Sequence, residues 1–173
     1  MKILDTARLV LRTVEAADAP FYLELVNDPD FVANIGDRGI RTVDAARTHI
    51  DNGPVRMQAV LGHAIWLVEK KDSGVPIGMC GLIKRDTLPD VDLGYAFLPA
   101  WRGQGYAFEA ARAVVDHARD RLGLARLLAI TSPHNTASGA LLEKLGLHFD
   151  KIVHLTAEDP GTRLYTMQLC ATA

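Results

Sequence analysis

The segment from Phe97 to Ala107 combines a strand end, a glycine-containing turn and the start of a helix. The first N–H groups of a helix have no partners inside it, and the aligned peptide dipoles place about half a positive charge there. Gly103 and Gly105 allow the backbone to approach an anion without an intervening Cβ, and Ala107 permits close packing. These residue types at this spacing predict a turn that binds a phosphate group.

Two common phosphate motifs do not fit this turn. A Walker A loop requires Gly-Lys followed by Ser or Thr, and this turn has no such sequence. A dinucleotide fingerprint requires Gly or Ala three residues after its second glycine, where this chain has Phe108, and the chain does not open with a βαβ unit. A turn that binds no ligand remains the alternative on local spacing alone.

The elements that must position this turn are strands and helices in a mixed order. We expect strands at about 8–12, 64–69, 76–83, 91–98, 127–131, 148–155 and 163–169, and helices at about 16–27, 42–52, 106–121 and 136–145. Residues 31–41 are predicted to form an irregular loop, and Gly53-Pro54 to end the second helix. This order predicts an α/β (α+β) chain whose front half is largely antiparallel.

One face of the strand at 91–98 carries small residues in its middle. Asp92, Gly94, Ala96 and Leu98 share this face, and small residues in a strand often mark a close approach by another group. Either a ligand or a bulky helix could occupy that space.

Composition restricts the function classes. The chain has 173 residues, of which 49% are hydrophobic and 23% charged, which is typical of one globular domain. A formal net charge of −2 gives no electrostatic footprint for nucleic acid or an anionic membrane surface. No apolar run is long enough to span a membrane, and Met1–Arg8 does not read as a secretory signal.

The cysteines and histidines predict neither a disulfide framework nor a metal site. Cys80 and Cys170 stand far apart and are interpreted as reduced thiols, which favours a cytoplasmic location. The six histidines show no zinc-ligand spacing.

Three motifs resemble those of one enzyme superfamily. Arg102-x-x-Gly105-x-Ala107 resembles the R/Q-x-x-G-x-G/A motif of the GNAT N-acetyltransferases, whose turn holds the pyrophosphate of acetyl-coenzyme A. Asn135-x-x-Ser138 and the following 141–149 resemble the family's N-x-x-S/A…L-x-x-L-G-F segment. Residues 8–12, Arg-Leu-Val-Leu-Arg, are similar to the "ERLxLR" opening of the RimJ/RimL-like branch, whose named members acetylate ribosomal protein N-termini.

The resemblance covers nearly the whole chain and implies a single GNAT domain over 1–173. Its sheet would be mixed and mostly antiparallel, with six to seven strands, splayed central strands and about four flanking helices. The pantetheine arm of acetyl-coenzyme A would lie between the strands at 91–98 and 127–131.

The same resemblance assigns the residues that bind the cofactor. Backbone groups near Phe97 and Leu98 would bond the pantetheine amides, as an open sheet edge allows. The pyrophosphate would be held by the backbone of Gly103, Gln104, Gly105, Tyr106 and Ala107. Arg102 would lie near it, with a solvated surface arginine as the alternative. Asn135 would bond the cofactor arm, although an asparagine before a helix is also a favoured N-cap.

Ser138 and Asp92 are the candidate catalytic residues. Ser138 matches a proposed general acid toward the departing thiolate, and its alternative is merely to satisfy the first helical turn. Many relatives have a tyrosine one turn later, where this chain has Leu142. Asp92 would polarise a water that deprotonates the amine, unless it is a solvent-facing strand carboxylate. Tyr95 and His134 are weaker candidates.

The resemblance implies direct acetyl transfer from acetyl-coenzyme A to an amine, so neither cysteine need be a nucleophile. An α-amine asks little of a base, since about a tenth of it is neutral at pH 7, against roughly 0.04% of a lysine. The acceptor could be a protein N-terminus, a lysine, an antibiotic or polyamine, or a free amino acid. Asp28, Asp30 and Asp37 would suit a cationic acceptor.

The sequence is also compatible with two other functions and with a homodimer. The chain could be a catalytically silent module that binds acyl-coenzyme A or, less in keeping with the motifs, a plain nucleotide binder.

Overall fold

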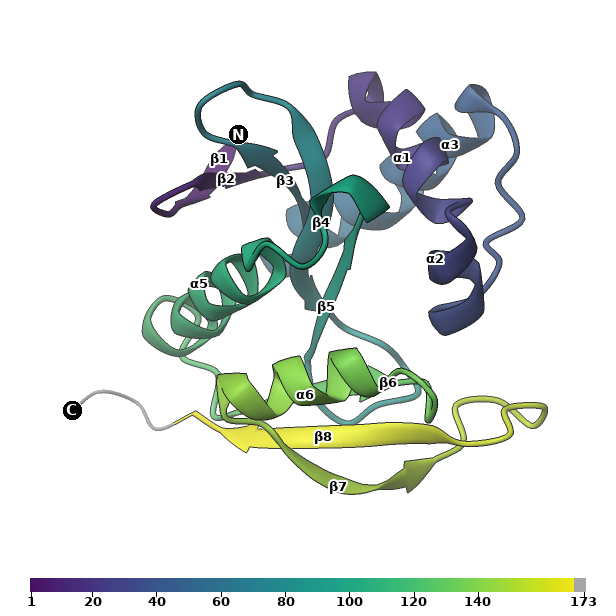
Figure 1. The fold of residues 1–173 in the computed structure, drawn as a ribbon, viewed down its shortest axis with the longest axis vertical. Coiled ribbons are helices and arrows are strands. Elements are labelled where there is room, and N and C mark those ends of the chain that lie inside the picture. Colours follow the sequence, from purple (N-terminus) through teal and green to yellow (C-terminus); the bar gives the residue numbers. More distant parts are fainter. Residues whose placement is uncertain (170–173) are drawn as a thin grey trace.

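A computed structural model describes residues 1–169, which form one eight-stranded sheet flanked by helices (Figure 1). The strands are β1 (Lys2–Asp5), β2 (Leu9–Arg12), β3 (Ile65–Lys70), β4 (Pro76–Ile83), β5 (Asp92–Phe97), β6 (Arg126–Thr131), β7 (His148–Val153) and β8 (Thr162–Gln168). The helices are α1 (Ala19–Val26), α2 (Pro29–Asn34), α3 (Val43–Ile50), α4 (Arg56–Leu61), α5 (Tyr106–Asp120) and α6 (Thr136–Leu145). The strand order is β1-β2-β3-β4-β5-β6-β8-β7, and every neighbouring pair is antiparallel except β5 and β6.

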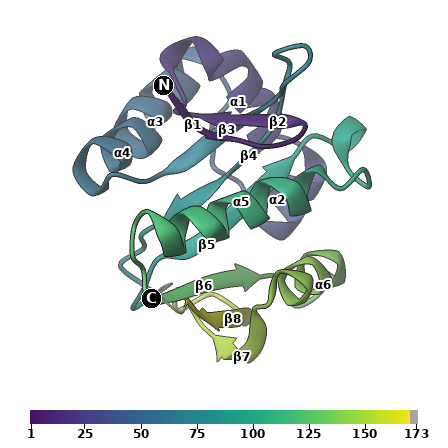
Figure 2. The ribbon, with the colours of Figure 1, turned by 90° about the vertical axis from the view of Figure 1, so that its left-hand side faces the viewer.

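Two hydrophobic layers form because side chains alternate across each strand. Trp66 and Cys80 lie in the cluster that includes α5, whereas the adjacent Leu67 and Met79 lie in the cluster formed with α1 and α3. Figure 2 shows α5 crossing one face of the sheet. The alternation of side chains along β3 and β4 therefore gives α5 a hydrophobic face of the sheet to pack against.

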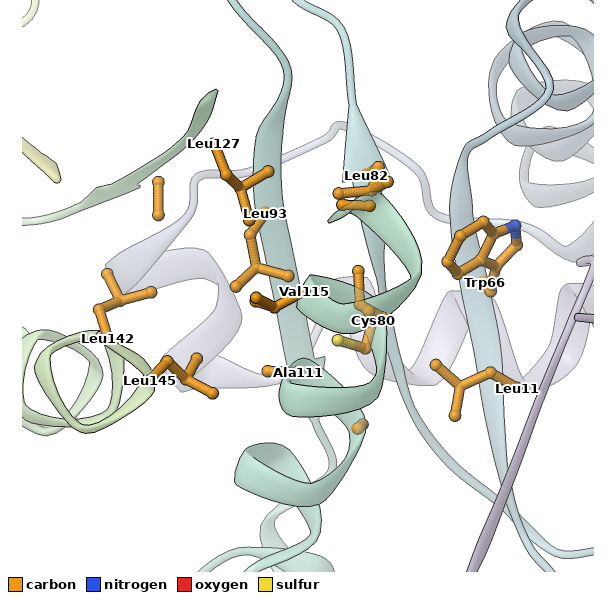
Figure 3. Packing of buried hydrophobic residues seen from close by; sticks show 14 of the residues in the cluster. Leu11, Trp66, Cys80, Leu82, Leu93, Ala111, Val115, Leu127, Leu142 and Leu145 are labelled. Carbon is orange, nitrogen blue, oxygen red and sulfur yellow. The ribbon is translucent and has the colours of Figure 1, made fainter. Parts of the chain in front are cut away.

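Helix α5 packs closely because its buried stripe is made of small side chains. Ala110, Ala111, Val114 and Ala118 are all fully buried. Ala111 and Val115 lie near Cys80 of β4 and Leu93 of β5 (Figure 3). Burial of this stripe fixes the head of α5 relative to the end of β5.

The sheet has one strand more than the six to seven expected. Strand β1 is only four residues long, and both of its ends are exposed, so its sequence carries little alternation. It pairs with β2 and extends the sheet by one edge strand.

Two helices were missing from the expected set. Helix α2 occupies the start of the predicted loop at 31–41, because Pro29 takes the first helical position and the Asp28 carboxylate accepts the Phe31 N–H at 3.1 Å. Gly53-Pro54 does not end the second helix. The chain passes through a π-helical turn, η2 (Asp51–Val55), which accommodates Pro54 and leads into α4.

A side chain from β4 covers part of the small-residue face of β5. A Cβ at Gly94 would lie 2.8 Å from Ile83 Cδ1, so Ile83 occupies part of the space that was left to a ligand or a bulky helix. Within residues 1–169, no helix has the length and apolar character needed to cross a membrane.

Candidate active site

The parallel strands β5 and β6 separate soon after they begin. Within the described chain, a single register pair joins them, Asp92 with Leu128, whereas six pairs join β5 to β4 and six join β6 to β8. Beyond that pair a cavity of about 1000 Å³ opens, lined by Tyr95 and Phe97 on one side and Ala129 and Thr131 on the other. The separation leaves backbone groups of two strands facing a common space.

The glycine turn lies where β5 ends at this cavity. Gly103 and Gly105 have φ values of +70° and +81°, a left-handed conformation that glycine adopts without steric cost. Gly105 is the N-cap of α5, and no side chain of the described residues caps this helix. The first N–H groups of α5 are therefore available to an anion, as the sequence predicts.

Most residues expected to bind the cofactor line this one cavity. Those that do are Phe97, Arg102, Gly103, Gly105, Tyr106, Ala107, Asn135 and Ser138. Leu98 and Gln104 do not. The Leu98 N–H donates to the Ile77 carbonyl at 3.0 Å, and the Gln104 side chain donates to the Ala100 carbonyl at 2.9 Å. Their side chains and the Leu98 amide are thus engaged within the protein.

Arg102 connects the turn to α2. Its Nε donates to the Phe97 carbonyl at 2.8 Å, one Nη donates to Asp28 at 2.5 Å, and the other pairs with Asp30. Arg102 is exposed, as in the alternative of a surface arginine, but three partners hold its guanidinium. The bond to Phe97 also occupies a carbonyl that was expected to serve the pantetheine arm.

Asn135 and Ser138 lie at the head of α6. The Asn135 side-chain oxygen accepts the Ser138 N–H at 3.2 Å, which confirms the capping role. The Ser138 hydroxyl instead reaches across the cavity to the Tyr95 hydroxyl, at 2.6 Å. Burial raises the pKa of Tyr95 to about 12, so this phenol stays protonated at neutral pH and cannot serve as a base.

Asp92 lies at the closed end of the cleft and is fully buried. The alternative of a solvent-facing carboxylate is therefore wrong. Its oxygens accept from Arg85 Nε at 3.0 and 3.2 Å. Burial raises the pKa of Asp92 above its ordinary value of 3.8, and the nearby Arg85 charge opposes that shift. A raised pKa makes this carboxylate a better proton acceptor than an exposed aspartate.

His134 and Cys80 lie outside the cavity. His134 is exposed and does not line the cavity. Cys80 is fully buried in the core, where burial raises the pKa of its thiol, so it is not a reactive nucleophile. Cys170 lies outside the described residues.

Sequence reasoning missed three partners of the site: Arg85, Arg8 and Glu109. Arg85 pairs with Asp92 from seven positions away, beyond the end of β4. Arg8 pairs with Glu109 in the first turn of α5, 101 positions along the chain. Arg8 belongs to the motif at residues 8–12, but nothing in sequence spacing signals a contact over that separation.

Comparison with known proteins gives a consistent match. The acetyltransferase (GNAT) domain family model matches residues 8–148. The uncharacterized protein YkkB of Bacillus subtilis is 31% identical over 153 residues, which is 87% of each chain. An acetyltransferase from Agrobacterium tumefaciens superposes with a TM-score of 0.81 at 27% identity, covering 97% of this chain and 94% of that one. RimL, a ribosomal L7/L12 α-N-protein acetyltransferase solved with coenzyme A, gives 0.83 at 16% identity and covers 99% and 100%.

Proposed function

Because this chain belongs to the GNAT family of acetyltransferases, we propose that its cleft moves the acetyl group of acetyl-coenzyme A to a primary amine of a protein N-terminus or a small molecule. Membership makes the chain an acyltransferase that uses acetyl-coenzyme A. The observation that carries the proposal is the separation of β5 from β6 beside the uncapped head of α5. An extended thioester arm and its diphosphate fit those two features together.

The pyrophosphate would bind the backbone N–H groups of residues 103–107. The positive end of α5 and the two left-handed glycines favour an anion at this position. The arm would then follow the unpaired edge of β5 toward Tyr95, with Asn135 and Ser138 on the opposite wall. Along this path the thioester would lie between the Tyr95–Ser138 pair and the closed end of the cleft.

The reaction requires a neutral amine to attack the thioester carbonyl. The new C–N bond forms, a backbone N–H of the splayed strand stabilises the oxyanion, and the C–S bond then breaks to release a thiolate. Asp92 would accept the amine proton through a water. Its burial and its position at the strand junction support this role.

The departing thiolate would take the proton of the Ser138 hydroxyl while Ser138 Oγ takes the proton of the Tyr95 hydroxyl, and water would return a proton to Tyr95. For Ser138 to donate into the cleft, the Tyr95 hydroxyl must donate to Ser138 Oγ, and the 2.6 Å contact allows that direction. A phenol is more acidic than an aliphatic hydroxyl, so Tyr95 is the better donor of the pair, and its hydroxyl also lies 3.3 Å from the Ser138 carbonyl. The relatives' tyrosine position is filled here by Leu142, which is buried in the core and cannot assist.

The three carboxylates that were expected to attract a cationic acceptor are already paired with arginines of the protein. Asp28 and Asp30 pair with Arg102, and Asp37 pairs with Arg41 at 2.6 Å. Their charges are compensated within the protein. We therefore favour a monoamine acceptor, such as an α-amine, over a polycation.

The test is coenzyme A release measured with purified protein against a panel of amines, including short peptides with free N-termini, lysine, polyamines and amino acids. We expect free thiol to appear only when both acetyl-coenzyme A and an accepted amine are present. Tight binding of acetyl-coenzyme A with no thiol released by any amine would contradict transfer and favour the catalytically silent module.

A further inference from the structure

Arg8 contacts the head of α5 at three points. Its Nε donates to Glu109 Oε2 at 2.6 Å, and one Nη donates to the Gln104 carbonyl at 3.0 Å. The guanidinium also lies 4.3 Å from the centre of the Tyr106 ring. A single side chain from the β1–β2 connection thus holds both the glycine turn and the first turn of the helix.

Glu109 completes this cluster. Its Oε1 accepts the Thr6 hydroxyl at 2.6 Å and the Arg8 N–H at 2.8 Å. Burial alone would raise the pKa of Glu109, but the hydrogen bonds from Thr6 and Arg8 outweigh it and lower the pKa. The carboxylate is therefore charged at neutral pH, close to the place where the pyrophosphate would bind.

The ion pair compensates a charge that would otherwise oppose binding. A carboxylate in the first turn of α5 would repel a diphosphate at the same helix end, and the Arg8 guanidinium neutralises it. A Cβ at Gly105 would lie 3.3 Å from Arg8 Nη2, so the arginine packs directly against the turn. Gly105 and Tyr106 line the cavity but Arg8 does not, so Arg8 lies behind the turn.

We propose that Arg8, together with Glu109, is a positioning residue that holds the glycine turn in the conformation that binds the pyrophosphate of acetyl-coenzyme A. This inference rests on the proposed function. A turn with two left-handed glycines has many accessible conformations when nothing holds it. Affinity falls in proportion to the fraction of molecules whose turn is in the binding conformation.

Global stability should depend little on this cluster, which separates a positioning role from a structural one. The Arg8 side chain is 45% exposed, and exposed ion pairs contribute little to folding. The contacts are therefore expected to affect the turn far more than the core.

The experiment compares Arg8→Ala and Arg8→Lys with wild type by coenzyme A calorimetry, steady-state kinetics and thermal unfolding. For Arg8→Ala we expect the Kd for coenzyme A and the KM for acetyl-coenzyme A to rise about tenfold, while kcat stays within about twofold of wild type. These values correspond to a tenfold fall in the fraction of molecules whose turn is in the binding conformation. Arg8→Lys should not restore affinity, because one ammonium cannot reproduce the fork that spans Glu109 and the Gln104 carbonyl.

Arg12 provides the matched control. It belongs to the same sequence motif and is also held by carboxylates, Asp18 and Glu69, but these lie away from α5. Arg12→Ala should lower the Tm and leave the Kd for coenzyme A unchanged. Glu109→Gln is a second probe, because it removes the charge while keeping an oxygen acceptor, and we expect a smaller rise in Kd.

An unchanged Kd in both Arg8→Ala and Glu109→Gln would overturn the inference while leaving the proposed function intact. Full restoration by Arg8→Lys would also overturn it, since charge alone would then suffice. A wild-type protein that neither binds coenzyme A nor releases thiol would overturn the proposed function and this inference with it.

Discussion

At the residue scale, the chemistry depends on two hydroxyls from different elements. Tyr95 comes from β5 and Ser138 from the first turn of α6, and they meet across the cleft at 2.6 Å. Their contact orients the Ser138 proton, which is the property that a general acid needs.

We predict that Tyr95→Phe lowers kcat about five- to tenfold, because a neutral hydrogen bond contributes roughly 1 kcal/mol. Ser138→Ala should lower kcat about a hundredfold if it removes the general acid. Adding Tyr95→Phe to Ser138→Ala should cost little more, since the two act as a unit. Steady-state kinetics of the three variants measures this, and fully multiplicative losses would show that the hydroxyls act independently.

Asp92 gives a pH-dependent prediction about stability. Its folded pKa is raised above its ordinary value of 3.8, so the native state binds this proton more tightly than the unfolded chain does. The corresponding stabilisation is present below pH 3.8 and is lost as pH rises through the folded pKa. Asp92→Asn removes this titration.

The free energy of unfolding of wild type should therefore fall, relative to Asp92→Asn, as pH rises from about 4 toward neutrality. Denaturant titrations at several pH values measure the difference. A difference that grows in favour of wild type over this range would show that Arg85 outweighs the burial of Asp92.

At the element scale, the glycine turn is held between α2 and the β1–β2 connection. Arg102 joins its start to Asp28 and Asp30, while Arg8 joins its end to Glu109. Both anchors come from segments far away in sequence. Sequence spacing predicts the turn itself, but it does not predict the ion pairs of Arg102 and Arg8 that hold the turn.

Gly105→Ala tests the turn against a matched glycine. Gly105 and Gly123 both have positive φ, +81° and +63°, and an alanine at either position should cost about 1–2 kcal/mol of stability. Of these two glycines only Gly105 lines the cavity, so we expect only Gly105→Ala to weaken coenzyme A binding, by about tenfold or more. The added Cβ would hold the diphosphate away from the backbone N–H groups and weaken its charge-assisted hydrogen bonds. Equal coenzyme A affinities by calorimetry would remove the turn from the binding site.

Arg102→Ala should loosen α2. It leaves the Asp28 carboxylate, which is only 8% exposed, without its cationic partner. An unpaired buried group costs about 1–3 kcal/mol, so the Tm should fall and amide hydrogen exchange in α2 should accelerate. An unchanged Tm would show that water replaces the guanidinium without loss.

At the whole-molecule scale, the sequence predicts the features that depend on residues close together in the chain. The helix over Tyr106–Asp120, the glycine turn and the capped head of α6 follow from spacing within a few residues. The Tyr95–Ser138 and Arg8–Glu109 contacts depend on how distant elements come together in the fold, so spacing could not supply them.

Two errors have local physical causes. Residues 31–41 were predicted to form a loop, but Asp28 followed by Pro29 starts a helix, α2, that extends to Asn34. Gly53-Pro54 was read as a helix end, although a π-helical turn accommodates a proline without breaking the helix.

The whole fold should be stabilised by its ligand. Acetyl-coenzyme A at a hundred times its Kd adds about 2.7 kcal/mol, which is about 5–10 °C in Tm for a chain of this size. Differential scanning fluorimetry measures the shift. An equal shift with ATP at the same concentration would favour the plain nucleotide binder.

The central claim is that the head of α5 binds a diphosphate and directs a thioester between β5 and β6. The most direct test is a crystal structure of this chain grown with coenzyme A. We predict the diphosphate on the backbone N–H groups of Gly103–Ala107 and the pantetheine arm between the two strands. A coenzyme A molecule seated elsewhere, with that helix end empty, would contradict the claim.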